Sequence, residues 1–219
     1  MNNSHEDITR LRAVYADRLE QQELFTQYSL MNPSYLFSIQ NRQRHIINLL
    51  KIKDLTDLKS KRILEIGCGN GNVLLEFLLL GADIKRIFGI DLLMDRVRCA
   101  KNTLSNANII NTDGQRLPFV SQKFDIILQF TAFSSILNQK IKVNMASEML
   151  RVLRNNGFIL WYDFWWNPIN PEMDGIKRRE IRNLFPNCTY RFRKITLAPP
   201  ITRKILNVSW GLANILESL

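Results

Sequence analysis

The sequence predicts an α/β fold in which helices cover both faces of a parallel sheet. An apolar run, Ile63–Ile66, passes directly into a turn with three glycines at 67–71, and a leucine-rich helical segment follows at 72–80. A second apolar run, 86–91, then ends in a carboxylate. A strand, a glycine turn, a helix and a second strand form a βαβ unit, in which the two strands lie parallel.

The rest of the chain continues this alternation. Two segments with apolar residues at helical spacing precede the first strand, at 5–24 and 34–51, and we expect residues 1–58 to form a helical lid. Residues 59–219 are then the sheet domain, and the whole chain forms one compact domain. The later elements are expected in this order: a helix at 94–105, strands at 108–111 and 124–130, a helix at 141–153 that Asn155–Gly157 stops, a strand at 158–164, a helix at 175–185, a strand at 189–197 and a helix at 210–219.

Composition narrows the class of protein. Apolar residues make up 46% of the 219 residues and charged residues 23%, which are ordinary values for a globular protein. No apolar run is long enough to span a membrane, and the polar N-terminus is unlike a signal peptide. The three cysteines are widely spaced, so we expect reduced thiols in a cytoplasmic protein, with no disulfide frame and no metal site.

Positive charge gathers toward the C-terminus. The net charge is +10, and residues 151–219 hold 11 basic and 5 acidic residues, against 8 and 7 in residues 1–60. This excess fits either an anionic partner, such as RNA or a lipid surface, or a solvated cationic face.

The glycine turn indicates a nucleoside ligand that carries no phosphate. The third glycine comes too early for the dinucleotide fingerprint G-x-G-x-x-G, and the Lys-Ser/Thr pair of a P-loop is absent. Glu65 stands two residues before Gly67, where a carboxylate opposes a phosphate and suits a cation. Asp91 ends the next strand, where a carboxylate can accept the protons of a ribose diol.

This pattern, E-x-G-x-G-x-G followed by Asp91, resembles the class I methyltransferases that use S-adenosyl-L-methionine (SAM) and release S-adenosyl-L-homocysteine. The resemblance covers about residues 30–165. It implies a Rossmann-like sheet with the strand order 3-2-1-4-5-7-6. Six strands can be counted, so the seventh is missing, which leaves a gap beside the fifth strand or a homodimer that fills it.

The resemblance also implies the residues that bind the cofactor. Asp91 holds the ribose, Asp113 accepts the adenine amino group, and Gln129 and Phe130 face the transferred methyl group. The full set is Glu65, Gly67, Cys68, Gly69, Asp91, Leu92, Asp113, Gly114, Gln129 and Phe130.

Asp163 is the first candidate for a general base, with His45 as the second. Asp163 follows the fifth strand among Trp161, Tyr162 and Phe164, where an acceptor would meet the methyl group. A strand-end carboxylate that caps backbone amides is the competing interpretation.

The acceptor stays open at this point. A small molecule or glycan methylated on a hydroxyl is favoured. The chain also resembles a bacterial group with W-Y-D-F at this strand end and a T-L-A-P-P turn, whose members often accompany glycosyltransferases. Methylation of nitrogen or carbon in a metabolite is the alternative, and a protein that binds SAM without catalysis is a further one. RNA is the remaining alternative, but residues 128–131 lack the N-P-P-Y type motif of amino-group methylation on bases, so we expect no nucleic-acid substrate.

Overall fold

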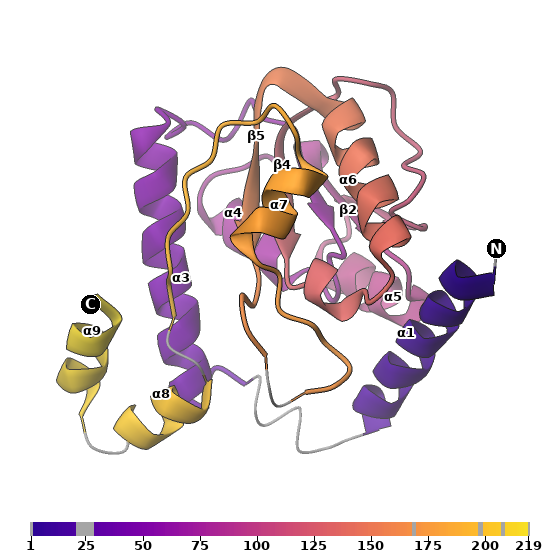
Figure 1. Cartoon of the computed structure of the whole chain (residues 1–219). Coiled ribbons are helices and arrows are strands. Elements are labelled where there is room, and N and C mark those ends of the chain that lie inside the picture. The colour runs from indigo at the N-terminus through magenta and orange to yellow at the C-terminus, as the bar shows by residue number, and fades with distance from the viewer. Residues whose placement is uncertain (1, 21–28, 168–169, 197–198, 207–208, 219) are drawn as a thin grey trace. The chain divides into compact units, whose positions relative to one another are not determined.

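The computed structural model describes residues 2–20, 29–167, 170–196, 199–206 and 209–218 (Figure 1). The chain forms two compact units, which we describe separately. Unit 1 comprises Met1–Val14 and Asp57–Thr189, and unit 2 comprises Tyr15–Thr56 and Tyr190–Leu219. The first helix, α1 (Asn2–Glu20), contributes to both units, because the boundary falls after Val14.

Unit 1 is built on a parallel sheet with the strand order β3-β2-β1-β4-β5, which confirms the predicted α/β class. Its strands are β1 (Ile63–Ile66), β2 (Ile87–Asp91), β3 (Asn108–Asn111), β4 (Phe124–Phe130) and β5 (Leu153–Tyr162). Its helices after α1 are α4 (Asn72–Leu79), α5 (Met94–Thr103), α6 (Gln139–Val152) and α7 (Arg178–Leu184), with single 3-10 turns at η1 (Ile84–Arg86) and η2 (Phe133–Ser135).

The order of the strands reverses its direction at β1. The chain moves from β1 outward through β2 to β3, and then returns to β4 beside β1 and moves outward to β5. Right-handed crossovers therefore put α4 and α5 on one face of the sheet and α6 on the other. In such sheets a ligand binds at the carboxyl ends of the strands where the order reverses, here between β1 and β4.

The two central strands are apolar because both of their faces are covered. Every residue of β1 is buried, and in β4 only Asp125 is partly exposed. Leu64 pairs with Phe88 of β2 on one side and with Ile127 of β4 on the other. This continuous packing fixes the strand ends that carry the candidate site.

Two departures from the prediction in the last third of the chain concern the sheet. The described residues form a five-stranded sheet, because the strand expected at 189–197 has no regular structure over residues 189–196. The expected helix stop at Asn155–Gly157 is also wrong, since β5 already begins at Leu153 and these residues lie within it. A Cβ on Gly157 would come within 2.8 Å of the Asp125 carbonyl oxygen, so this glycine allows the close approach of β4.

Unit 2 is helical in its described residues, with α3 (Pro33–Ile52), α8 (Pro199–Leu206) and α9 (Trp210–Ser218). Its core holds Phe37, Leu206 and Ala213, with Ile205 packed against them. The Trp210 ring meets the Phe37 ring edge-on, with 5.5 Å between their centroids. The helix at α8 was not expected, since Pro199-Pro200 begins it instead of only ending a strand.

The predicted division into a lid at 1–58 and a sheet domain at 59–219 differs from these units at both ends of the chain. Residues 1–14 belong with the sheet, and residues 190–219 belong with α3. The lid role of the N-terminal helices stays a prediction. None of the helices in the described ranges is both long and apolar enough to cross a membrane.

Candidate active site

The glycine turn after β1 is joined to the end of β2 by the Asp91 carboxylate. Asp91 Oδ2 accepts a hydrogen bond of 2.8 Å from the Gly69 amide, and Oδ1 accepts one of 2.9 Å from the Leu93 amide. The Cys68 amide also donates to the Ile90 carbonyl oxygen at 2.8 Å. Asp91 is buried, and each of its oxygens keeps a further lone pair for a ligand.

The turn needs glycine for its backbone conformation and for space. Gly67, Gly69 and Gly71 have φ values of 69°, 53° and 85°, in the left-handed region. A Cβ on Gly67 would stand 2.8 Å from the Ala132 Cβ, and one on Gly71 would stand 2.9 Å from Leu104 Cδ1. The turn therefore packs directly against the segment that follows β4.

Gln129 and Asp163 form a hydrogen-bonded pair across the ends of β4 and β5. Gln129 Nε2 donates to Asp163 Oδ2 at 2.9 Å. Gln129 is fully buried, and its Oε1 accepts no hydrogen bond within the described part of the chain. Because a buried acceptor without a partner is costly, this oxygen marks a place where a donor from a ligand would be stabilised.

The segment between Gln129 and α6 is held in an unusual backbone conformation. Thr131 has a φ of 58°, which is uncommon for any residue other than glycine and rarer still for a β-branched one. The Ser134 amide, in η2, donates to Asp163 Oδ2 at 3.1 Å, and the Phe164 amide donates to Oδ1 at 2.9 Å. Strained backbone of this kind is often found at functional sites.

These contacts run without a break along the carboxyl edge of the sheet. Asp91 holds Gly69, the turn at Gly67 packs on Ala132, and η2 just beyond Ala132 is held by Asp163. The structure thus brings the predicted residues of β1, β2, β4 and β5 into one continuous site.

Burial changes the proton affinity of two groups in this site. Desolvation raises the pKa of Asp163 above the ordinary value for aspartate, although its hydrogen bonds from Ser134, Gln129 and Phe164 act in the opposite direction. Burial, together with the carboxylates of Glu65 and Asp91, strongly raises the pKa of the Cys68 thiol. Cys68 therefore stays protonated and packs as a small apolar side chain, and Glu65 lies beside it as a buried carboxylate.

The other predicted cofactor residues lie at the same edge of the sheet. Asp113, after β3, accepts hydrogen bonds at 2.9 Å from both the amide and the side chain of Gln115, so it closes its own turn. Gly114 leaves room for Met145 of α6. Leu92 follows Asp91 directly, and the buried Phe130 ring lies 5.7 Å from the Tyr162 ring.

His45 is the predicted residue that unit 1 does not contain. It lies in α3 of unit 2 and is half-buried there. Its part in catalysis stays a prediction.

Sequence reasoning missed several side chains at this edge. Arg96 of α5 reaches the glycine turn, because its Nη1 lies 3.6 Å from where a Gly69 Cβ would be. Asp7 of α1 is buried and accepts the Leu137 and Asn138 amides at 3.1 and 2.9 Å. Arg10 donates to the Ser135 carbonyl oxygen at 2.7 Å and to Glu172 at 2.8 Å. The Asp7–Arg10 pair has helical spacing, but nothing in the sequence indicates partners more than 120 residues away.

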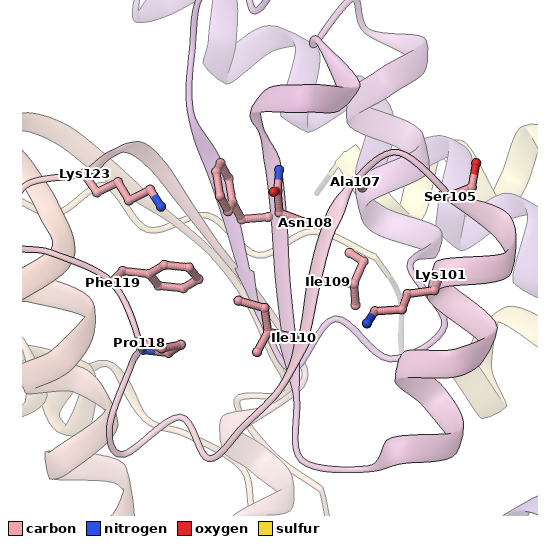
Figure 2. A pocket seen from close by; sticks show the side chains of 10 residues that line it. Lys101, Ser105, Ala107, Asn108, Ile109, Ile110, Pro118, Phe119 and Lys123 are labelled. Atoms are coloured by element: carbon pink, nitrogen blue, oxygen red, sulfur yellow. The ribbon is translucent and has the colours of Figure 1, made fainter.

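A hollow of about 610 Å³ lies elsewhere in unit 1, beside the edge strand β3 (Figure 2). It is lined by Phe88, Lys101, Ser105, Ala107, Asn108, Ile109, Ile110, Pro118, Phe119 and Lys123. The Lys123 ammonium stands over the Phe88 and Phe119 rings, 4.4 and 4.7 Å from their centroids. None of the predicted site residues lines this hollow, which we call the β3 groove.

Comparison with known proteins agrees with the geometry of the carboxyl edge. Residues 63–157, from β1 into β5, match the family described as methyltransferase domain. The chain carries a methyltransferase domain. The match contains the glycine turn, Asp91, Asp113 and Gln129, and it ends before Asp163.

Relatives differ in what they methylate. The chain is 32% identical over 116 residues to the fatty-acid O-methyltransferase of Mycolicibacterium smegmatis. This match covers 49% of this chain and 38% of that protein. The chain is 37% identical over 83 residues to a putative protein N5-glutamine methyltransferase of Methanocaldococcus jannaschii, with 37% and 41% covered. The chain thus spans about two fifths of the length of these curated relatives.

A solved structure supports the fold. The SAM-dependent methyltransferase of Methanosarcina mazei superposes with a TM-score of 0.53 at 20% identity, over 61% of this chain and 81% of that one. The methyltransferase domain therefore has the Rossmann-like fold of such proteins.

Proposed function

We propose that the protein is a SAM-dependent methyltransferase that transfers a methyl group to a hydroxyl of a small-molecule or glycan acceptor. The observation that carries the proposal is the continuous site at the carboxyl edge, where Asp91 holds the glycine turn and Asp163 holds Gln129 and η2. Bound SAM would supply an electrophilic methyl group on a sulfonium.

The residues of the site fit this cofactor. Glu65 and Asp91 are buried carboxylates beside the turn, which suits a cationic ligand and disfavours a phosphate. The further lone pairs of Asp91 suit a ribose diol, and Gln129 Oε1 offers an acceptor that no described residue uses. The described residues contain no cluster of His, Cys, Asp and Glu that could hold a metal ion.

Asp163 is the group that we propose as general base for a hydroxyl acceptor. Its carboxylate is oriented by hydrogen bonds from Gln129, Ser134 and Phe164, and the hydroxyl of an acceptor would replace one of these donors to reach it. Its raised pKa makes it a stronger base than an ordinary aspartate.

The aromatic residues after Asp163 favour an acceptor with apolar or ring surface. Phe164, Trp165 and Trp166 follow it directly and are exposed. The Trp165 and Trp166 rings are tilted against each other, with 6.4 Å between their centroids. An acceptor that covers these rings would exclude water from the methyl group and orient its hydroxyl for transfer.

The first test is calorimetry of SAM binding to Asp91→Ala. Loss of a charge-assisted partner of the ribose should weaken binding by about 1.5–3 kcal/mol. Asp95→Ala is the matched control, since Asp95 lies four residues later in the first turn of α5, is exposed and pairs only with Arg98 among the described residues. Unchanged affinity in Asp91→Ala would contradict the cofactor site. Methyl transfer from isotope-labelled SAM to hydroxyl, amine and RNA acceptors would then identify the acceptor atom.

The proposal also includes where the protein is found and how it assembles. Cys68, Cys99 and Cys188 are free thiols, in keeping with a reducing cytoplasm. The apolar strand β5 has one paired edge within the described chain, and a second copy of the protein could cover the other.

A further inference from the structure

Two residues of α1 hold the backbone from η2 to the start of α6. Asp7 Oδ2 accepts hydrogen bonds from the Leu137 and Asn138 amides at 3.1 and 2.9 Å. Arg10 donates from Nη2 to the Ser135 carbonyl oxygen at 2.7 Å and from Nε to Asp7 Oδ1 at 2.9 Å. We call Asp7 and Arg10 the α1 clamp. This part of α1 belongs to unit 1, so these contacts all lie within one unit.

The clamp is also joined to the loop that follows β5. The other terminal nitrogen of Arg10, Nη1, donates to Glu172 Oε2 at 2.8 Å. Two residues later, the Asp174 amide donates to the Ser134 carbonyl oxygen at 2.8 Å. The guanidinium therefore ties three segments together, because its planar fork of donors reaches α1, η2 and this loop at the same time.

The segment that the clamp holds is the one that orients Asp163. The Ser134 amide donates to Asp163 Oδ2 at 3.1 Å, and the next residue, Ser135, offers the carbonyl oxygen that accepts Arg10. The turn η2 is only three residues long, and so short a turn does not fix its own position through internal hydrogen bonds. The strained backbone at Thr131, just before η2, must likewise be held by its surroundings. The place of η2 at the strand end therefore depends on contacts from outside, and the clamp supplies them.

The clamp lies in protected surroundings, which favours a role in geometry over one in attachment alone. The side chains of Asp7 and Arg10 are 7% and 24% exposed. Apolar packing can hold a helix in place as well as a buried ion pair does, and Leu11 of α1 is already buried. What the ion pair adds is direction, because a hydrogen bond restricts the angle between two groups as well as their distance.

We propose that Asp7 and Arg10 are positioning residues for methyl transfer, which act through η2 to keep the Ser134 amide against the Asp163 carboxylate. This role rests on the proposed function, in which Asp163 removes the proton of a hydroxyl acceptor. The clamp keeps the Ser134 amide in place while the acceptor replaces one of the other two donors. Without the clamp, the carboxylate loses its fixed direction and one of the hydrogen bonds that lower its pKa.

Nuclear magnetic resonance of the chain labelled with carbon-13 aspartate tests this role without an acceptor. The Asp163 carboxyl signal is the one that disappears in Asp163→Asn, and its titration gives the pKa of this group. In Arg10→Met this pKa should rise, because a carboxylate that loses a hydrogen-bond donor holds its proton more tightly. Hydrogen exchange of the Ser134 amide should be at least about tenfold faster in the same variant.

Two further variants of α1 separate position from charge. Arg10→Lys keeps the charge beside Asp7 but has no planar fork, so the pKa of Asp163 should still rise in it. It also replaces Arg10→Met if circular dichroism shows that variant to be unfolded. Arg12→Met is the matched control, because Arg12 lies on the same stretch of α1 and is exposed. It should leave the pKa of Asp163 and the exchange rate as they are in the parent.

Turnover connects the clamp to methyl transfer. With the hydroxyl acceptor identified by labelled SAM, Arg10→Met should lower turnover about tenfold or more and leave SAM affinity unchanged. Combined with Asp163→Asn, it should lower turnover no further, because both changes act through the same carboxylate.

The outcomes distinguish this role from the proposed function. An equal pKa of Asp163 in the parent, Arg10→Met and Arg10→Lys would overturn the role of the clamp and leave the general base in place. A raised pKa with undiminished turnover would also overturn it, since catalysis would then not need the position that the clamp fixes. If Asp163→Asn itself turns over like the parent, the general base is wrong and the clamp loses this role with it.

Discussion

The carboxyl edge of the sheet and the β3 groove are two candidate ligand sites of unit 1. They differ in how far their polar groups are hydrogen-bonded. In the groove, the Asn108 amide donates to two carbonyl oxygens and the Lys123 ammonium stands over aromatic rings. At the carboxyl edge, Gln129 Oε1 is buried and has no hydrogen-bond partner among the described residues, and Thr131 has a left-handed backbone conformation. By strain and unused acceptors, the carboxyl edge is the better candidate for a functional site than the more open groove.

Among variants of the two regions, Gly67→Ala at the carboxyl edge is expected to have the largest effect on stability and on SAM binding. The new Cβ would meet Ala132 at 2.8 Å in a left-handed conformation, so the free energy of unfolding should fall by about 2–5 kcal/mol, and SAM binding should be lost with it. Gly81→Ala is the control, since Gly81 has a φ of 98° but no atom within 4 Å of its Cβ position. It should lose about 1–2 kcal/mol and bind SAM normally. Urea unfolding measures the free energy of unfolding, and calorimetry measures the SAM affinity. Equal SAM affinity in the two variants would contradict a role of the glycine turn in binding SAM.

Asp163→Asn should have the next largest effect, on turnover. With a hydroxyl acceptor, we expect turnover to fall about 100-fold or more while SAM affinity stays unchanged. Because Asp163 must lose its proton to act as a base, activity of the parent should rise with pH through a pKa above the ordinary aspartate value, and this limb should vanish in the variant.

Asp174→Asn is the control for that experiment, as an exposed carboxylate in the same loop. If Asp163→Asn turns over within a few-fold of the parent at every pH, the carboxylate only caps amides. Catalysis then rests on positioning alone.

The smallest effect is expected in the groove. Lys123→Met keeps the packing on Phe88 and Phe119 and removes only the cation, so the free energy of unfolding should change by less than about 1 kcal/mol. SAM affinity and turnover should be unchanged. A clear loss of either would make the groove part of the functional site and break the comparison.

The sequence predicted the carboxyl edge better than the rest of the molecule, for a physical reason. Gly67, Gly69 and Asp91 act through local backbone geometry, so their pattern is already visible in the chain. Asp163 was placed correctly at a strand end, but its partners Gln129 and Ser134 lie about 30 residues away and depend on the register of β4 and β5. The left-handed Thr131 has no signal in the sequence at all.

The errors in the last third of the chain have a similar origin. The alternation of apolar and polar residues at 189–197 is a strand pattern, but a strand also needs a partner strand in register. None of the five strands of the described sheet pairs with this segment. The glycine at 157 has two possible uses. It could end a helix, or it could let two strands approach, and only the contact with Asp125 decides between them.

The contacts of Asp7 and Arg10 have a consequence for the order in which unit 1 folds during translation. Both residues leave the ribosome early, but their partners Ser135, Leu137 and Glu172 are synthesised 125, 130 and 162 positions after the residues that bind them. The Asp7 carboxylate cannot accept hydrogen bonds from the Leu137 and Asn138 amides until the start of α6 has been synthesised. The first helix therefore cannot pack in its final place until most of the chain has been translated. The N-terminus, although made first, is among the last parts of unit 1 to be fixed in place.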